Sequence, residues 1–204
     1  MRYVLVSGST RANAQSLKVA QWLCEEIKKA SSENSADVID LYGAEIPVWD
    51  DTAWKASSEL SQYVKPYQEK VKDADAIILI SPEWHGMVPG GLKNFLLYIS
   101  SKHAAHKPCL LVGVSGSIGG SYPISELRMS GYKNNRMVYV PDHLIVRNVE
   151  KVMNDHDFEI EDGEDKYIKN RALYSLNALY AYTHALKTMR DSNDLLNSDY
   201  PNGM

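Results

Sequence analysis

Cysteine and excess positive charge are both scarce in this sequence. Its 204 residues include two cysteines, and 22 lysines and arginines against 26 aspartates and glutamates give a formal net charge of −4. So few cysteines cannot build the disulfide framework of a small secreted protein. The charge balance provides no basic surface to attract nucleic acid or an anionic membrane. We therefore expect a cytoplasmic protein with no nucleic-acid or membrane partner.

Long hydrophobic runs and the best-known phosphate motifs are missing as well. No apolar run approaches the length of a membrane span, and the chain enters a predicted strand at Tyr3 without the charged and apolar regions of a signal peptide. No Gly-x-Gly-x-x-Gly follows that strand, and no Gly-x-x-x-x-Gly-Lys occurs. These absences argue against a dinucleotide-binding half-fold and against a nucleoside triphosphatase.

Metal-ligand spacing is absent around the two cysteines. Cys24 and Cys109 fit better as small core residues. Seven carboxylates lie between Asp155 and Asp165, but a calcium loop needs glycine at its sixth position, where Ile160 stands. We expect a solvated connection there and no metal site.

Strand and helix signals alternate along the chain. Strands are predicted at about 3–7, 37–41, 76–81, 109–115 and 137–146, and helices at about 16–30, 58–74, 92–100, 124–134 and 166–189. Five strands with interposed helices predict an α/β fold, a doubly wound parallel sheet with right-handed crossovers. We expect residues 1–204 to form a single domain. The last helix is expected to pack through Ala172, Leu176, Leu179, Tyr180, Thr183, Leu186 and Met189.

The loop after the first strand, 7–16, is rich in hydroxyl and amide groups. Free N–H groups and the positive end of a helix dipole meet where such a loop enters a helix, which favours an anion such as phosphate. The alternative is that Ser16 or Asn13 only caps the helix. The side chains that could bind phosphate are those of Ser9, Thr10, Arg11, Asn13, Gln15 and Ser16.

Two further loops follow the third and fourth strands. In the loop 81–94, prolines restrict the backbone, and Gly86 has no side chain to keep a ligand away from the main chain. Main-chain groups of this loop could therefore contact a flat ligand beside Trp84 and His85. The alternative is a tight turn with one exposed aromatic. The glycines of the loop 115–122 could approach a ligand edge or serve only to reverse the chain. In the strand order 2-1-3-4-5, all three loops meet at one end of the sheet, at its switch point.

With these motifs in order, the chain resembles the NADPH-dependent FMN reductase family within the flavodoxin-like fold. The resemblance covers roughly residues 1–146. It rests on Gly8-Ser9-Thr10-Arg11 with Gln15-Ser16, on Pro82 to Gly86 with Pro89-Gly90 and Leu92-Lys93-Asn94, and on the loop from Gly116 to Gly120 followed by Leu127-Arg128.

The resemblance implies non-covalent FMN, with NADPH or NADH as the hydride donor and a quinone, azo compound, free flavin or metal oxyanion as the acceptor. It also implies a homodimer or homotetramer. Ser9, Arg11, Gln15 and Ser16 would hold the phosphate of FMN. Pro82, Glu83, Trp84, His85 and Gly86 would line the isoalloxazine, and Ser115, Gly116, Gly119 and Gly120 would meet its pyrimidine edge.

Trp84-His85 departs from the family's usual Tyr-Asn. Tryptophan keeps a stacking face, but the polar group moves. No acid–base side chain is required, because hydride chemistry belongs to the flavin. Among the candidates, His85 could tune or protonate the reduced flavin, and a structural or surface histidine is the alternative.

Two other functions fit parts of the sequence. Gly113-Val-Ser115-Gly-Ser117 nearly forms the nucleophile elbow of a serine hydrolase, with Asp142-His143 downstream, although the fifth position is serine rather than glycine. A noncatalytic flavin-binding electron carrier is the other alternative. A net charge of −4 is modest for a carrier that docks by electrostatics.

Overall fold

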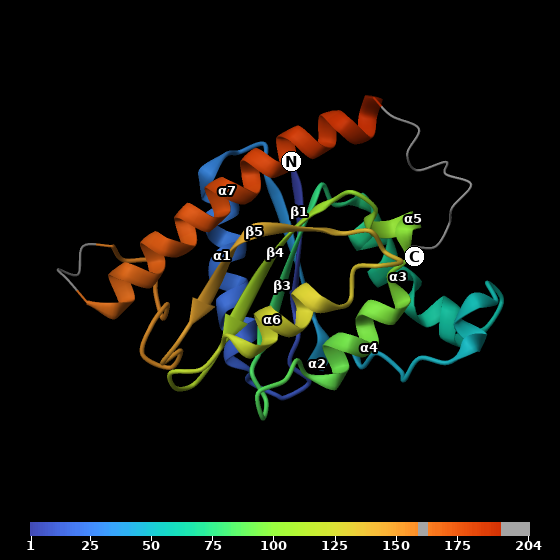
Figure 1. Cartoon of the computed structure of the whole chain (residues 1–204), viewed down its shortest axis with the longest axis horizontal. Coiled ribbons are helices and arrows are strands. Elements are labelled where there is room, and N and C mark those ends of the chain that lie inside the picture. The colour runs from blue at the N-terminus through green and yellow to red at the C-terminus, as the bar shows by residue number, and fades with distance from the viewer. Residues whose placement is uncertain (159–162, 193–204) are drawn as a thin grey trace.

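A five-stranded parallel sheet in the order β2-β1-β3-β4-β5 forms the centre of the molecule (Figure 1). The computed structural model describes residues 1–158 and 163–192. The predicted flavodoxin-like, doubly wound sheet is confirmed, including its strand order. The strands are β1 (Arg2–Ser7), β2 (Ser35–Asp40), β3 (Ala76–Pro82), β4 (Pro108–Val114) and β5 (Val138–Val146).

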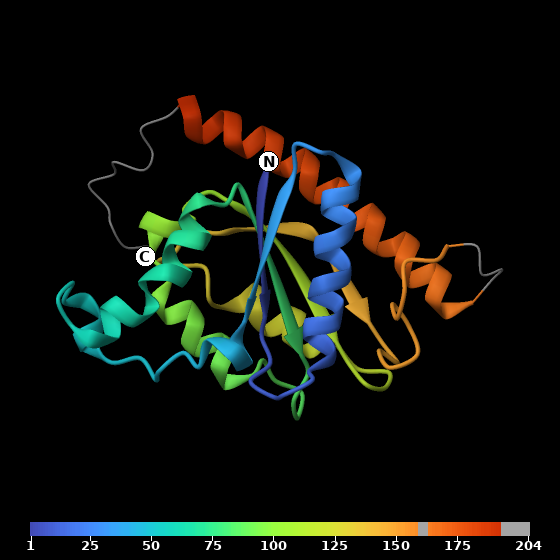
Figure 2. The same ribbon diagram turned by 180° about the vertical axis from the view of Figure 1, so that it is seen from behind.

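Helices cover both faces of this sheet. Figure 2 shows α1 and the long α7 on one side, and Figure 1 shows α4 and α6 on the other. The helical elements are α1 (Gln15–Ala30), α2 (Leu41–Ala44), the short 3-10 helix η1 (Asp51–Trp54), α3 (Glu59–Asp73), α4 (Gly90–Tyr98), α5 (Ser101–Ala104), α6 (Tyr122–Met129) and α7 (Glu164–Ser192). No helix in the described residues is long and apolar enough to cross a membrane.

The apolar run in β3 explains why this strand lies at the centre. Ile78 and Ile80 pack into the core beneath α1 and α7, whereas Ile77 and Leu79 pack into the core beneath α3, α4 and α6. A strand covered on both faces needs apolar residues at every position rather than at alternate ones. The two cysteines are free and buried, which confirms that they are small core residues.

Two helical predictions need correction. The helix expected at 124–134 ends at Met129, because Ser130 is extended and Gly131 has a φ of +80°. In the last helix, the expected apolar face is wrong in part: Tyr180 is 49% exposed, and small or polar residues complete the buried side. The buried residues of α7 are Ile168, Lys169, Ala172, Ser175, Leu179 and Thr183. Within the predicted acidic connection, residues 159–162 lie outside the described residues.

Candidate cofactor site

The loops after β1, β3 and β4 meet around a cavity of about 220 Å³ at the carboxyl end of the sheet. This is the edge where open α/β sheets bind ligands. The cavity brings together the predicted residues Ser9, Arg11, Gln15, Ser16, Pro82, Glu83, Trp84 and Gly116. The predicted residues Thr10, His85, Gly86, Ser115, Gly119 and Gly120 do not line it.

The N-terminus of α1 opens into this cavity without a side-chain cap. Its N-cap residue is Ala14, which makes no side-chain hydrogen bond, so the hypothesis that Ser16 or Asn13 caps the helix is wrong. The buried Ser16 hydroxyl instead lies 3.2 Å from that of Ser7. The first-turn N–H groups of a helix have no intrahelical partner. The N–H of Leu17 donates to the Ala14 carbonyl at 3.0 Å, and Gln15 and Ser16 line the cavity, so this helix start can offer its remaining N–H donors to an anion.

Polar side chains around this helix start have hydrogen-bonding capacity that the protein does not use. Ser9 is buried, and its Oγ accepts a hydrogen bond of 3.2 Å from the backbone N–H of Arg11. The Gln15 Oε1 atom is buried and has no hydrogen-bond partner among the described residues. A buried polar atom without a partner is costly and indicates that a partner is missing. The Arg11 side chain is exposed at the rim.

Close backbone packing fixes the position of this loop. The Gly8 N–H donates to the carbonyl of Ile80 at 2.8 Å, which ties the loop to β3. A Cβ on Gly91, at the start of α4, would lie 2.5 Å from the Thr10 Cγ2 atom. Thr10 therefore packs against α4 instead of lining the cavity.

The loop after β3 forms a two-residue hairpin at its tip. The backbones of Trp84 and Met87 exchange hydrogen bonds of 3.1 and 2.9 Å. His85 and Gly86 between them both have positive φ, +50° and +72°, as in a type I′ turn. The tight turn considered as the structural alternative is thus present. His85 is exposed at its tip, whereas Trp84 at its base lines the cavity.

Glu83 joins the second loop to the third. Its Oε2 accepts a hydrogen bond of 2.6 Å from the N–H of Gly120, and its own N–H donates to Val114 at 2.9 Å. A Cβ on Gly119 would lie 2.8 Å from the Glu83 Oε1 atom, so the Glu83 carboxylate would have to move to admit it. The N–H of Gly120 is consequently engaged by the protein. On the other side, Arg147 Nε donates to the carbonyls of Ile118 at 2.7 Å and Gly119 at 3.0 Å.

The arrangement around Ser115 does not support a serine hydrolase. His143 pairs with Leu111 in the sheet, so it lies about 13 Å along the strands from Ser115, four residues further on. Asp142 is engaged by the Arg171 guanidinium at 3.0 Å. Burial opposes ionisation of Asp142, but hydrogen bonds from Arg171 and Ser175 hold its pKa below the ordinary value. These three side chains do not form a triad.

Sequence reasoning missed the wall of the cavity that follows β5. Val149 and Glu150 line it, together with Ala14 and Val114. The available signal was the end of the fifth predicted strand, since all parallel strands end at the same edge of the sheet. Neither residue type suggested a ligand.

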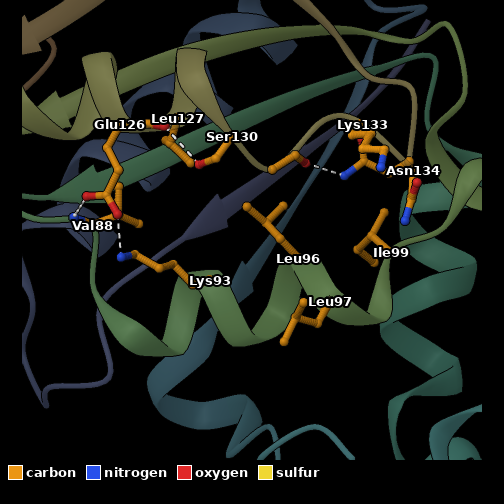
Figure 3. Close-up of a pocket in the computed structure, with 12 residues that line it drawn as sticks. Val88, Lys93, Leu96, Leu97, Ile99, Glu126, Leu127, Ser130, Lys133 and Asn134 are labelled. Carbon is orange, nitrogen blue, oxygen red and sulfur yellow. Dashed lines mark hydrogen bonds and ion pairs between the residues drawn. The ribbon is translucent and has the colours of Figure 1, made fainter. Parts of the chain in front are cut away.

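A second cavity, of about 320 Å³, lies between α4 and α6 and contains none of the predicted residues (Figure 3). Its floor is apolar, with Leu96 and Leu127. Glu126 pairs with Lys93 and accepts a 2.7 Å hydrogen bond from the N–H of Val88. Asn135 Nδ2 donates to the Gly131 carbonyl at 2.5 Å. These polar groups already bind one another.

Comparison with known proteins agrees with the geometry of the loops. The family profile described as NADPH-dependent FMN reductase matches residues 1–151, which is most of the chain. The chain belongs to this family. An FMN-dependent NADPH-azoreductase of Staphylococcus aureus is 33% identical over 130 residues, which are 63% of this chain and 68% of that protein. The protein is therefore an oxidoreductase of the NAD(P)H-dependent flavin reductase family.

Solved structures show the same fold at much lower identity. An oxidoreductase from Corynebacterium diphtheriae is 13% identical, with a TM-score of 0.66 over 90% of this chain and 97% of that chain. The flavoenzyme NAD(P)H:(acceptor) oxidoreductase from Paracoccus denitrificans is 15% identical, with a TM-score of 0.61 over 92% and 97%. At these identities the likeness supports the fold alone.

Proposed function

We propose that this chain binds FMN non-covalently in the cavity between the three loops and oxidises NAD(P)H through it. The observation that carries the proposal is the uncapped start of α1, which opens into a polar cavity beside the buried Ser9 hydroxyl. The residues present fit a flavin mononucleotide, because its phosphate requires several donors at one end and its ring a thinner, partly aromatic surface at the other.

The phosphate end would lie at the N-terminus of α1. Main-chain N–H groups and the helix dipole favour a dianion there. The hydroxyls of Ser9 and Ser16 add donors, the Gln15 side-chain amide can present N–H groups, and Arg11 supplies the charge. A phosphate held by a charged guanidinium and backbone donors gains both orientation and affinity.

The isoalloxazine end would lie along Pro82, Trp84 and Gly116. When bound, FMN supplies the hydride chemistry. The protein positions the ring: Glu83 and Arg147 fix the 115–120 loop, and a Cβ on Gly116 would meet no atom within 4 Å, so this glycine leaves open space for a ligand edge. The exposed place of His85 at the hairpin tip favours the surface-histidine alternative over a role in proton transfer.

A small organic acceptor such as an azo compound or a quinone would take the electrons in our proposal. The support is the named activity of the azoreductase relative, at 33% identity. Free flavin and metal oxyanions are further candidates, and the donor is NADPH or NADH. Assembly into a homodimer or homotetramer stays a prediction.

The test is a spectral titration. Purified protein should be yellow or turn yellow with added FMN, and anaerobic NADPH or NADH should bleach the bound flavin. Protein that binds no FMN would overturn the proposal. Binding without reduction by either nucleotide would support the noncatalytic electron carrier instead.

A further inference from the structure

The wall of the cofactor cavity after β5 belongs to a longer segment, residues 148–158, which we name the strap. Its first part is joined to the third loop: the N–H of Val149 donates to Ser115 at 3.1 Å, and that of Asn148 to Ser117 at 3.0 Å. Val149 is buried and Glu150 is exposed, and both line the cavity. The position of the strap therefore sets one side of the site.

Two side chains of α1 donate hydrogen bonds to the strap. Lys18 Nζ donates to the Val152 carbonyl at 2.9 Å and to Asn154 Oδ1 at 2.7 Å, and it also binds the Val149 carbonyl. Trp22 Nε1 donates to the Asp155 carbonyl at 2.7 Å. Since α1 begins at the proposed phosphate site, one helix carries both the phosphate end and the fastening of the opposite wall.

The far end of the strap is fastened by His156. Its Nδ1 lies 2.6 Å from Glu26 Oε1, and its Nε2 lies 2.6 Å from Glu25 Oε2. The imidazole stacks on the Trp22 ring at 5.4 Å between centroids and 4° between planes. A carboxylate only accepts hydrogen bonds, and neutral imidazole has a single N–H donor. Two carboxylates can both be satisfied only by the imidazolium, which donates from both nitrogens.

The other charged groups around His156 also have ionic partners. On α1, Lys29 Nζ lies 2.8 Å from the same Glu26 oxygen. From α7, the buried Lys169 lies 2.6 Å from Asp155 and 2.7 Å from Asp165. Its Nζ also donates to the Asp157 carbonyl at 2.7 Å. The mostly buried Glu26 carboxylate thus contacts both Lys29 and His156, whereas Glu25 is exposed.

Resting on the proposed function, we propose that the His156 imidazolium, held between Glu25 and Glu26, is a positioning residue of the cofactor site. It fastens the strap to α1 and so holds the Val149–Glu150 wall in place. When His156 loses its proton, one of its two carboxylate contacts is lost, the far end of the strap is held less firmly against α1, and the affinity for FMN falls. Cofactor retention is thereby coupled to pH through a residue outside the cavity.

The proton is tested first, by NMR of imidazole nitrogens in the cofactor-free protein. The His156 signal, assigned by its loss in His156→Gln, should show both nitrogens protonated near neutral pH. A neutral imidazole there would overturn the inference, because it cannot donate to both glutamates.

The coupling is tested by measuring the dissociation constant of FMN across pH. Wild type should bind FMN about tenfold more weakly at about pH 9 than at about pH 6, as linkage to one proton allows. His156→Gln should bind weakly at both values, with a smaller change. Titration of FMN itself and of other groups is common to both proteins, so the difference between them reports His156.

Two further variants complete the design. His184→Gln changes an exposed histidine of α7 and should behave like wild type. Glu25→Gln, at a half-exposed position, leaves one carboxylate for a neutral imidazole and should reduce the pH dependence even if His156→Gln fails to fold. If FMN affinity depends equally on pH in wild type and Glu25→Gln, this inference is overturned and the proposed function is unaffected. Absence of FMN binding by wild type at every pH would overturn the proposed function and this inference with it.

Discussion

The cavity between α4 and α6 and the cavity between the three loops differ in size and in how far their polar groups are already hydrogen-bonded. The cavity between α4 and α6 is the larger, at about 320 Å³, yet Glu126, Lys93 and Asn135 bind partners within or beside it. The loop cavity is smaller, at about 220 Å³, but contains an uncapped helix start and an unpartnered Gln15 oxygen. The uncapped helix start, rather than volume, therefore marks the loop cavity as the better candidate for an anionic ligand.

The largest expected effect concerns the satisfied cavity. Asn135→Ala removes the acceptor of the Met137 N–H, at 3.0 Å, and the donor to the Gly131 carbonyl. Both contacts involve a buried side chain, so the free energy of unfolding should fall by about 2–3 kcal/mol. Chemical denaturation measures this loss. FMN affinity of the folded variant should stay within about twofold of wild type, since no ligand interaction is removed.

A large loss of FMN affinity in folded Asn135→Ala would break the comparison. It would mean that the cavity between α4 and α6 contributes to cofactor binding. Asn135→Asp keeps an acceptor for Met137 but loses the donor to Gly131, and should show an intermediate loss of stability.

The next prediction compares substitutions at two adjacent glycines at the start of α4, Gly91 and Gly90, by their effect on FMN affinity. In Gly91→Ala the new Cβ would meet Thr10 Cγ2 at 2.5 Å, so Thr10 must shift, and we expect the phosphate loop that carries it to be disturbed. FMN affinity should fall about fivefold, because misplaced donors lose part of a charge-assisted contact. Fluorescence quenching of FMN on binding provides the dissociation constant.

Gly90→Ala is the matched control and should have the smallest effect on FMN affinity. Its Cβ would meet no atom within 4 Å, so FMN affinity should be unchanged. Its stability should rise by about 0.4–1 kcal/mol because alanine restricts the unfolded chain. Equal losses of affinity in both variants would contradict the placement of Thr10 against α4.

Much of the fold could be predicted because it depends on patterns local to the sequence. The run 76–80 is apolar at every position, which indicates a strand covered on both faces, and the order of the loops follows from the parallel topology. The α7 face was harder. Its buried residues include Lys169 and Ser175, polar residue types that carry no hydrophobic signal.

The three loops that surround the cavity could be predicted from the sequence, but the individual residues that line it could be predicted less well. Ser9, Arg11 and Trp84 line the cavity, whereas His85 points to a hairpin tip because positive φ at two successive residues reverses the chain. The contact between Glu83 and Gly120 joins loops 37 residues apart. Such a contact depends on the exact spacing of two strand ends, which residue type alone does not specify.

The most direct test of the central claim compares FMN with riboflavin, which lacks the phosphate, in wild type and Arg11→Ala. If the N-terminus of α1 holds the phosphate, wild type should prefer FMN, and Arg11→Ala should lose about tenfold in FMN affinity with little change for riboflavin. The ratio of the two dissociation constants is the measured quantity. Equal weakening of both ligands, or no preference for FMN in wild type, would contradict the account.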